Sequence, residues 1–232
     1  MIMESVENSV SEWNREIQRE KKEEKYPKWP NEVMLKVLFG GGDYLRDPCK
    51  PQKDWKVLDV GCGFANNLVP FADLGCECHG VDLHPEMATT VQGIMDRRGY
   101  KTKIQAGSNR SLPYPAACFD LILSINTLHY EGTEGNIDKA LREFRRVIKP
   151  GGALYLSTVG PAHTIFTRAE KLGPHRYKVK NFDFRDGQDF FFFEDENSIQ
   201  KICKRIFPRI ETGRVTEKLM NLPLDFLIAL CR

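Results

Sequence analysis

From Trp55 onward, short apolar segments alternate with segments of helical periodicity, and this rhythm limits the possible folds more than any other feature of the chain. Strands and helices that alternate with short connections form a parallel sheet with right-handed crossovers. A predominantly apolar segment without alternation, such as 119–125, is typical of a sheet covered on both faces. The predicted strands are Val57–Val60, Cys78–Asp82, Lys103–Ala106, Phe119–Ile125 and Ala153–Thr158.

Two more strands are expected at about 209–215 and 223–231, close enough in sequence to pair antiparallel. The predicted fold is therefore α/β, a Rossmann-like doubly wound sheet of seven mostly parallel strands. We expect residues 1–50 to form an N-terminal helical cap and residues 51–232 the main domain. An insert is expected after the fifth strand, at about 160–193, because the strand–helix rhythm lapses there.

Within the cap, a polar segment at 4–28 predicts a surface helix, and Asn31 is a candidate N-cap for a second helix over 32–38. Within the insert, four consecutive phenylalanines occupy 190–193. A packed strand explains such a run better than the wall of a ligand pocket does. The remainder of the insert is expected to be a long loop, which in a compact domain is usually functional or disordered.

Charge and composition exclude several classes of function. The formal net charge is +2, from 34 basic and 32 acidic residues, which gives no field suited to nucleic acid. No apolar run approaches the ~20 residues of a membrane span, and the N-terminus lacks the apolar core of a signal peptide. The seven scattered cysteines indicate reduced thiols, and Cys76-Glu77-Cys78-His79 lacks the spacing of a metal site. We therefore expect a cytoplasmic protein with no bound metal.

Three segments should meet where parallel strands end, which is where such sheets bind ligands. They are Asp59-Val60-Gly61-Cys62-Gly63, Asp82 and Gly107-Ser108-Asn109. Glycines let the backbone approach a ligand closely, and a carboxylate after the second strand accepts hydrogen bonds from ribose hydroxyls. Position 66 is Asn, where a dinucleotide site prefers glycine, and no phosphate-binding loop is present. The pattern favours a nucleoside ligand with a substituent other than phosphate.

These motifs resemble the class I S-adenosylmethionine-dependent methyltransferase family, in particular its members that act on small molecules. The resemblance covers about 55–159 and is carried by Val57-Leu58-Asp59-Val60-Gly61-Cys62-Gly63, Val81-Asp82, Leu112-Pro113-Tyr114-Pro115, Phe119-Asp120-Leu121-Ile122, Leu128-His129-Tyr130, Leu141-Arg142-Glu143 and Lys149-Pro150-Gly151-Gly152.

The resemblance implies S-adenosylmethionine as the cofactor, with the Gly61–Gly63 loop against its methionine part, Asp82 on its ribose and Leu83 on its adenine. Many members have Asp where this chain has Ser108, so Asn109 is a possible substitute at the adenine edge. The implied cofactor residues are Asp59, Gly61, Cys62, Gly63, Asp82, Leu83, Ser108, Asn109, Ser124 and Asn126.

The acceptor side is expected to involve the insert and the segment after the fourth strand. His129 and His163 are the candidate catalytic bases, because imidazole titrates near neutral pH. For His129 the alternative is a buried histidine satisfied by a neighbouring group, and for Arg185 a local salt bridge is favoured. The candidate acceptor contacts are Tyr26, Trp29, Tyr130, His175, Tyr177 and Arg185.

The expected reaction is transfer of a methyl group to a small molecule by in-line displacement, which depends mainly on positioning. Candidate acceptors are sugars, phosphorylated surface-polysaccharide precursors, amines and secondary metabolites. A nucleic-acid or protein methyltransferase is the first alternative, but Ser124-Ile125-Asn126-Thr127 lacks the motif of enzymes acting on planar amines. A nicotinamide oxidoreductase and a non-catalytic cofactor-binding partner subunit are the others. The acceptor, the methylated atom, the need for a base and the oligomeric state stay open.

Overall fold

The computed structural model describes residue 15, residues 29–40 and residues 42–232. Tyr26 and nearly all of the surface helix expected over 4–28 lie outside these residues. The described part begins with the short helix α2 (Glu32–Phe39), whose first turn is capped by Asn31, as predicted. The Asn31 side chain accepts a hydrogen bond of 2.8 Å from the Met34 amide, which satisfies one of the free donors of the helix start.

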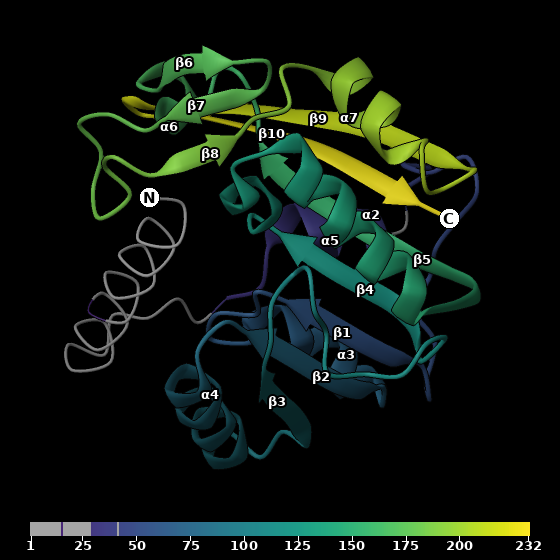
Figure 1. The fold of residues 1–232 in the computed structure, drawn as a ribbon. Helices are drawn as coiled ribbons and strands as arrows, with labels where there is room; N and C mark the ends of the chain where they lie inside the picture. The colour runs from purple at the N-terminus through teal and green to yellow at the C-terminus, as the bar shows by residue number, and fades with distance from the viewer. Residues whose placement is uncertain (1–14, 16–28, 41) are drawn as a thin grey trace.

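A seven-stranded sheet forms the centre of the molecule, in the order β3–β2–β1–β4–β5–β10–β9 (Figure 1). Strand β10 runs antiparallel to β5 and β9, and β1 to β5 run parallel to one another. The predicted doubly wound, mostly parallel sheet is therefore confirmed. The strands are β1 (Lys56–Val60), β2 (Glu77–Asp82), β3 (Thr102–Ala106), β4 (Phe119–Ile125), β5 (Ile148–Val159), β9 (Ile210–Leu219) and β10 (Leu222–Cys231).

Helices cover both faces of this sheet, as Figure 1 shows. Helices α2, α3 (Val69–Leu74) and α4 (Pro85–Arg97) pack on one face, and α5 (Glu134–Val147) and α7 (Glu196–Cys203) pack on the other. Adjacent strand residues point to opposite faces, so Val57 joins the first core and Leu58 the second. Burial of each such aliphatic side chain stabilises the folded state by about 1.5–3 kcal/mol.

The insert differs from the long loop that we expected. It contains the short helix α6 (Thr164–Thr167) and a three-stranded antiparallel sheet of β6 (Glu170–Gly173), β7 (Arg176–Lys178) and β8 (Asp189–Phe191). These strands are only three or four residues long, which is too short for hydrophobic periodicity to reveal them. Together they bury a separate small core of Val159, Ile165, Tyr177, Val179, Phe190 and Phe192.

The four phenylalanines of 190–193 are all fully buried, as the packed-strand interpretation requires, although strand β8 ends at Phe191 and includes only the first two. Phe190 and Phe192 belong to the small core of the insert, whereas Phe191 and Phe193 belong to the core beneath α5 and α7. This alternation is that of a strand, whose successive side chains face opposite sides. The run therefore fastens the insert to the main sheet.

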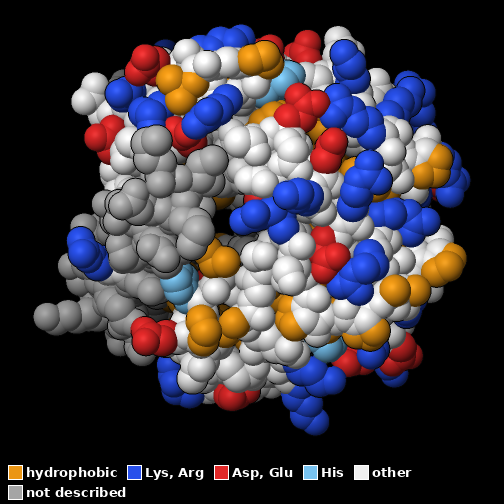
Figure 2. All heavy atoms as spheres, in the orientation of Figure 1, with side chains coloured by type: hydrophobic (Ala, Val, Ile, Leu, Met, Phe, Trp, Pro, Cys, Tyr) orange, Lys and Arg blue, Asp and Glu red, His pale blue; other side chains and the backbone are white. Residues whose placement is uncertain are grey.

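On the face that carries α5 and α7, Lys and Arg side chains are interspersed with Asp and Glu, and hydrophobic side chains are scattered among them (Figure 2). Within the described residues, no helix is long and apolar enough to cross a membrane. The seven cysteines are all described, and all are free thiols.

Candidate cofactor and acceptor site

The order of the strands reverses between β1 and β4, and the candidate site lies at the carboxyl ends of the strands around this point. Strand β1 pairs with β2 on one side and with β4 on the other, in parallel with both. The chain therefore leaves β1 and β4 in opposite directions, which opens a crevice at the end of the sheet. The loops that follow β1, β2, β3 and β4 border this crevice.

The loop after β1 is a tight glycine turn. Gly61 and Gly63 have φ angles of +69° and +49°, a left-handed conformation that favours glycine. The Gly61 amide donates a hydrogen bond of 2.8 Å to the Val81 carbonyl, which holds the turn against β2. A Cβ atom at Gly61 would lie 2.2 Å from Cγ2 of Thr127, whereas a Cβ at Gly63 would meet no described atom within 4 Å. The turn is thus closed on the Thr127 side and open at Gly63, as a cradle for a ligand requires.

Asp82 lies at the end of β2, beside this turn. Its Oδ2 accepts a hydrogen bond of 3.2 Å from the Gly63 amide, and its Oδ1 accepts one of 2.8 Å from the Leu83 amide. The N-cap of α4 is His84, so Asp82 is not the helix cap that was its alternative explanation. Each carboxylate oxygen has a second lone pair for a hydroxyl, and burial raises the pKa of Asp82. The half-exposed side chain of Leu83 adds apolar surface next to the carboxylate.

Asp59, two residues before Gly61, is a carboxyl group inside the protein. Its side chain is 1% exposed, and its Oδ2 lies 3.4 Å from Nδ2 of Asn67. Oδ1 has no hydrogen-bond partner among the described residues. Burial raises the pKa of Asp59 to about 7; the Asn67 hydrogen bond opposes this shift, and the negative charge of Asp82 adds to it. A buried, unpartnered oxygen beside an open glycine cradle fits a polar ligand at this place.

The loops after β3 and β4 hold the remaining residues predicted to bind the cofactor. Ser108 closes a turn with Ser111, and the Asn109 amide donates a 3.0 Å hydrogen bond to Glu131. Ser124 is fully buried, with its hydroxyl 3.0 Å from the Thr127 hydroxyl. The structure therefore places Ser124 behind the Gly61 turn and not on the surface of the crevice, contrary to our expectation.

Asn126 follows β4 at a φ of +56°, and its amide is bonded to the Ser157 carbonyl at 2.8 Å. Its side-chain Oδ1 is buried and finds no hydrogen-bond partner in the described part of the chain. Asn126 thus presents a second unsatisfied oxygen, on the β4 side of the crevice. Cys62 is buried between the two sides, with its sulfur near Gly80.

His129 is placed as a satisfied core histidine. It lies in the short helix η2 (Leu128–Glu131), is 2% exposed, and its Nδ1 is 3.1 Å from the Thr158 hydroxyl. Its ring packs against Tyr130 and Phe190, with centroid distances of 4.6 and 4.9 Å. Burial lowers the pKa of His129 to about 3, and nearby positive charge contributes. These surroundings oppose the predicted role as a proton-accepting base, because protonation would bury a charge.

His163 and Arg185 reach the neighbourhood of His129 from two other segments. Both influence the pKa of His129 through their charge. His163 caps α6 by accepting a 3.2 Å hydrogen bond from the Ile165 amide, and burial lowers its pKa. The Arg185 guanidinium is paired with Asp183, at 2.7 Å from Nε to Oδ1, which is the local salt bridge that we favoured. It also lies over two rings, those of Phe182 and Phe184, at 4.9 and 4.8 Å.

Other predicted acceptor contacts hold the insert together instead. The Tyr177 hydroxyl donates to Glu194 at 2.8 Å, and its ring is buried in the small core of the insert. The ring of His175 stacks on Phe191 at 5.2 Å between centroids, and its Nδ1 lies 3.1 Å from the Phe192 carbonyl. The expectation that these two side chains bind the acceptor therefore conflicts with their placement. Trp29 is largely exposed at the start of the described chain, and Tyr26 lies outside it.

Sequence reasoning missed Asn67 and Thr127. Asn67 bonds to Asp59, and its Oδ1 accepts a 2.9 Å hydrogen bond from the Asn31 amide, which ties α2 to the glycine loop. Thr127 donates a 3.3 Å hydrogen bond to the Val60 carbonyl and packs under Gly61. Their only signal in the sequence was their place directly after the glycine turn and after the fourth strand.

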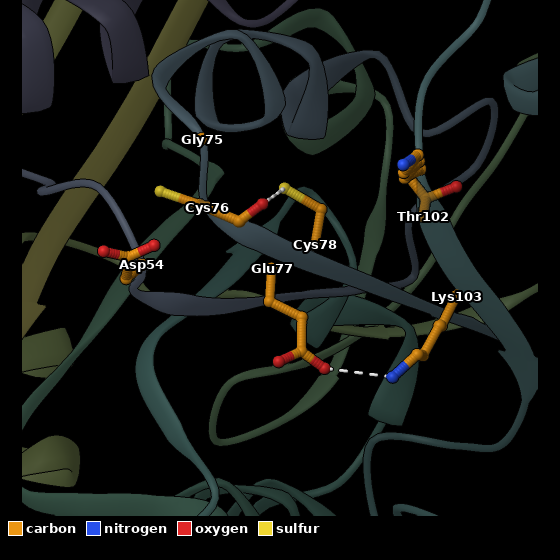
Figure 3. Close-up of a pocket in the computed structure, with 8 residues that line it drawn as sticks. Asp54, Gly75, Cys76, Glu77, Cys78, Thr102 and Lys103 are labelled. Atoms are coloured by element: carbon orange, nitrogen blue, oxygen red, sulfur yellow. Dashed lines mark hydrogen bonds and ion pairs between the residues drawn. The ribbon is translucent and has the colours of Figure 1, made fainter.

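A hollow at the opposite end of the sheet is not part of this site. Figure 3 shows it at the amino ends of β2 and β3, with a volume of about 460 Å³. Glu77 and Lys103 form an ion pair of 3.0 Å there, and the thiol of Cys78 donates to the Cys76 carbonyl. Among the described residues, no group of three or more His, Cys, Asp or Glu side chains is arranged to hold a metal.

The fold and the site define an α/β protein whose candidate ligand site, with the Asp82 carboxylate beside a glycine turn, lies at the point where the strand order reverses. A family model of the methyltransferase domain matches residues 58–156. The chain is 34% identical over 137 residues to norajmaline N-methyltransferase of Rauvolfia serpentina, which covers 57% of this chain and 44% of that protein. It is 29% identical over 132 residues to a sterol 4-C-methyltransferase of Caenorhabditis elegans, which covers 54% of this chain and 37% of that protein.

A solved S-adenosylmethionine-dependent methyltransferase of Methanosarcina mazei has the same fold, with a TM-score of 0.66 and 17% identity over 88% of this chain and 98% of that one. Over residues 58–156 the chain is therefore similar to the methyltransferase domain family, and its fold is that of solved S-adenosylmethionine-dependent methyltransferases. It spans less than half the length of the two curated relatives that it matches.

Proposed function

We propose that this protein transfers a methyl group from S-adenosylmethionine to a small-molecule acceptor. The observation that carries the proposal is Asp82, hydrogen-bonded to Gly63 at the end of β2, within a matched methyltransferase domain. The two relatives are named as a norajmaline N-methyltransferase and a sterol 4-C-methyltransferase. They support a small organic acceptor while differing in the atom methylated. The seven free thiols support a cytoplasmic location as part of this proposal.

In this proposal the cofactor half of the site is built by residues 57–126. Asp82 accepts hydrogen bonds from the ribose hydroxyls, Leu83 packs on the adenine and the Gly61–Gly63 turn lies against the methionine part. Asn109 is tied to Glu131, so adenine recognition rests on Leu83 and the backbone around Ser108. When bound, S-adenosylmethionine supplies a methyl group on a sulfonium, which is already an excellent leaving group.

We assign the acceptor half to the segment after β4 and to the insert, within a methyltransferase domain of residues 51–232 under a cap of residues 1–50. His129 and Thr158 form a rigid, neutral floor beneath Tyr130. A sulfonium needs little help in leaving, so these residues contribute mainly by orienting the acceptor. Tyr130, His163 and Arg185 are the polar groups that we assign to that task.

Calorimetric titration of the protein with S-adenosylhomocysteine and with NAD tests the cofactor assignment. We expect S-adenosylhomocysteine to bind and NAD to bind more weakly, because Asn occupies position 66 and no phosphate cradle is present. Tighter binding of NAD would refute the assignment. Incubation with labelled S-adenosylmethionine and a panel of amines, sterols, sugars and phosphorylated sugars then tests transfer. Cofactor binding without transfer to any acceptor would favour the non-catalytic partner subunit.

A further inference from the structure

Asp59 is a buried carboxyl group whose hydrogen bonds are incomplete. Within the described chain, its Oδ1 has no partner, and its Oδ2 has only the Asn67 amide at 3.4 Å. That distance is at the long end for a hydrogen bond. A buried carboxylate is normally paired with a cation or saturated with donors, because leaving it charged and unpaired is costly.

The groups that face Asp59 from the neighbouring elements do not supply the missing positive charge. Asp82 at the end of β2 is a second, half-buried carboxyl group, and its charge raises the pKa of Asp59. The thiols of Cys62 and Cys78 also lie close, and burial raises the pKa of each, so both stay neutral. His84, two residues further along, acts on Asp82 and lowers the pKa of that group. Among the described residues, no lysine or arginine forms an ion pair with Asp59 or Asp82.

This arrangement leaves the carboxyl group of Asp59 largely protonated below neutral pH, because burial raises its pKa to about 7. The ligand of the proposed function carries a cationic ammonium group on its methionine part. The glycine turn expected to hold that part begins two residues after Asp59. A cation that arrives beside Oδ1 would stabilise the carboxylate and displace the proton.

We propose that cofactor binding ionises Asp59: its carboxyl group holds a proton in the free protein and releases it to solvent as the ammonium group of the ligand binds. The O–H bond of the acid breaks, the proton passes to the buffer, and the carboxylate pairs with the ammonium. This inference rests on the proposed function, because it requires that the ligand be S-adenosylmethionine or its product. Its consequence is that affinity for the cofactor increases with pH.

Calorimetry of S-adenosylhomocysteine binding in two buffers of different ionisation enthalpy measures the number of protons released. We expect release of about half a proton per ligand near pH 7 and nearly one near pH 6, and a dissociation constant that falls up to about tenfold per pH unit below pH 7. The curve should level off above that pH. 5′-Methylthioadenosine, which shares the nucleoside but lacks the ammonium, should bind without proton release.

Two variants assign the proton to its residue. Asp59→Asn keeps the shape of the side chain, and it should abolish the release and flatten the pH dependence. His84→Gln is the matched control, because it replaces a neighbouring imidazole and leaves Asp59 in place, and it should keep the release of the wild-type protein. Binding of S-adenosylhomocysteine by the wild-type protein without proton release would overturn this inference alone. Release that persists in Asp59→Asn would overturn it as well. Failure of the folded wild-type protein to bind S-adenosylhomocysteine at all would overturn the proposed function.

Discussion

Replacing Arg214 by methionine should weaken the fold at the point where the insert leaves the sheet. Arg214 donates two hydrogen bonds of 2.7 Å to the carboxylate of Asp225, which is fully buried in β10. The same carboxylate accepts hydrogen bonds from the Thr216 hydroxyl at 3.2 Å and the Ala162 amide at 2.7 Å. A Cβ atom at Gly160 would lie 2.6 Å from Oδ2, so the turn after β5 is packed directly onto this group.

Removing one partner of a buried ion pair costs about 3–5 kcal/mol, because the other charge stays buried and unpaired. The Arg214 side chain is 35% exposed, so water can reach its place after substitution. We therefore expect a loss of about 3 kcal/mol, at the lower end of that range. For a chain of this size, that corresponds to a fall in Tm of roughly 6–12 °C.

Chemical and thermal unfolding, followed by far-UV circular dichroism, measure the loss. Arg209→Met is the matched control, because Arg209 pairs with Asp47 at 3.5 Å on the surface and should contribute no more than about 1 kcal/mol. Asp225→Asn in the Arg214→Met background should recover much of the stability, since it removes the unpaired charge. If Arg214→Met costs no more than Arg209→Met, the carboxylate is solvated by water and our reasoning about this pair is wrong.

Three further predictions concern the site. Gly61→Ala should abolish cofactor binding, measured by calorimetry, because the new Cβ would lie 2.2 Å from Thr127 and the φ of +69° is strained for alanine; normal affinity in this variant would contradict the geometry of the turn. Asp82→Ala should weaken binding of S-adenosylhomocysteine about tenfold or more while the protein stays folded, and an unchanged dissociation constant would show that Asp82 does not contact the ribose. Because burial holds the pKa of His129 at about 3, below the ordinary 6.5, the unfolded chain binds a proton that the folded chain excludes, and stability should fall as the pH drops below 6.5. Denaturant unfolding should show that the free energy of unfolding of His129→Gln falls by about 2 kcal/mol less than that of the wild-type protein between about pH 7 and pH 5. Equal falls in the two proteins would show that a water or a charge lies beside the ring.

The main sheet could be predicted from the sequence because its signals are strong and local. Strand β4 is mostly apolar, Pro85 begins α4, and glycines follow the end of β1. Each of these features reflects a physical requirement at one place, such as burial on both faces or a turn with positive φ. The same rules predicted Asp82 beside the glycine turn, where its hydrogen bond to Gly63 now places it.

The acceptor half was harder to predict, because burial and pairing are decided by segments far apart in sequence. His129 has the side chain of a base, but Thr158 and Phe190 enclose it, from β5 and from the insert. Tyr177 has a side chain of a type that often contacts ligands, but its hydroxyl donates a hydrogen bond to Glu194. A polar residue in an irregular segment predicts that some partner exists and not whether the partner is a ligand or another part of the chain.

The separate core of the insert has a consequence for how this protein diversifies. Phe190 and Phe192 pack with Ile165 and Val179 away from both main cores, and Phe191 and Phe193 anchor the unit to the core beneath α5 and α7. Mutations inside the small core therefore change the insert while the glycine turn and its carboxylates keep their packing. If the proposed function holds, substitutions in the insert can alter which acceptor is bound while the cofactor-binding end of the main sheet is conserved.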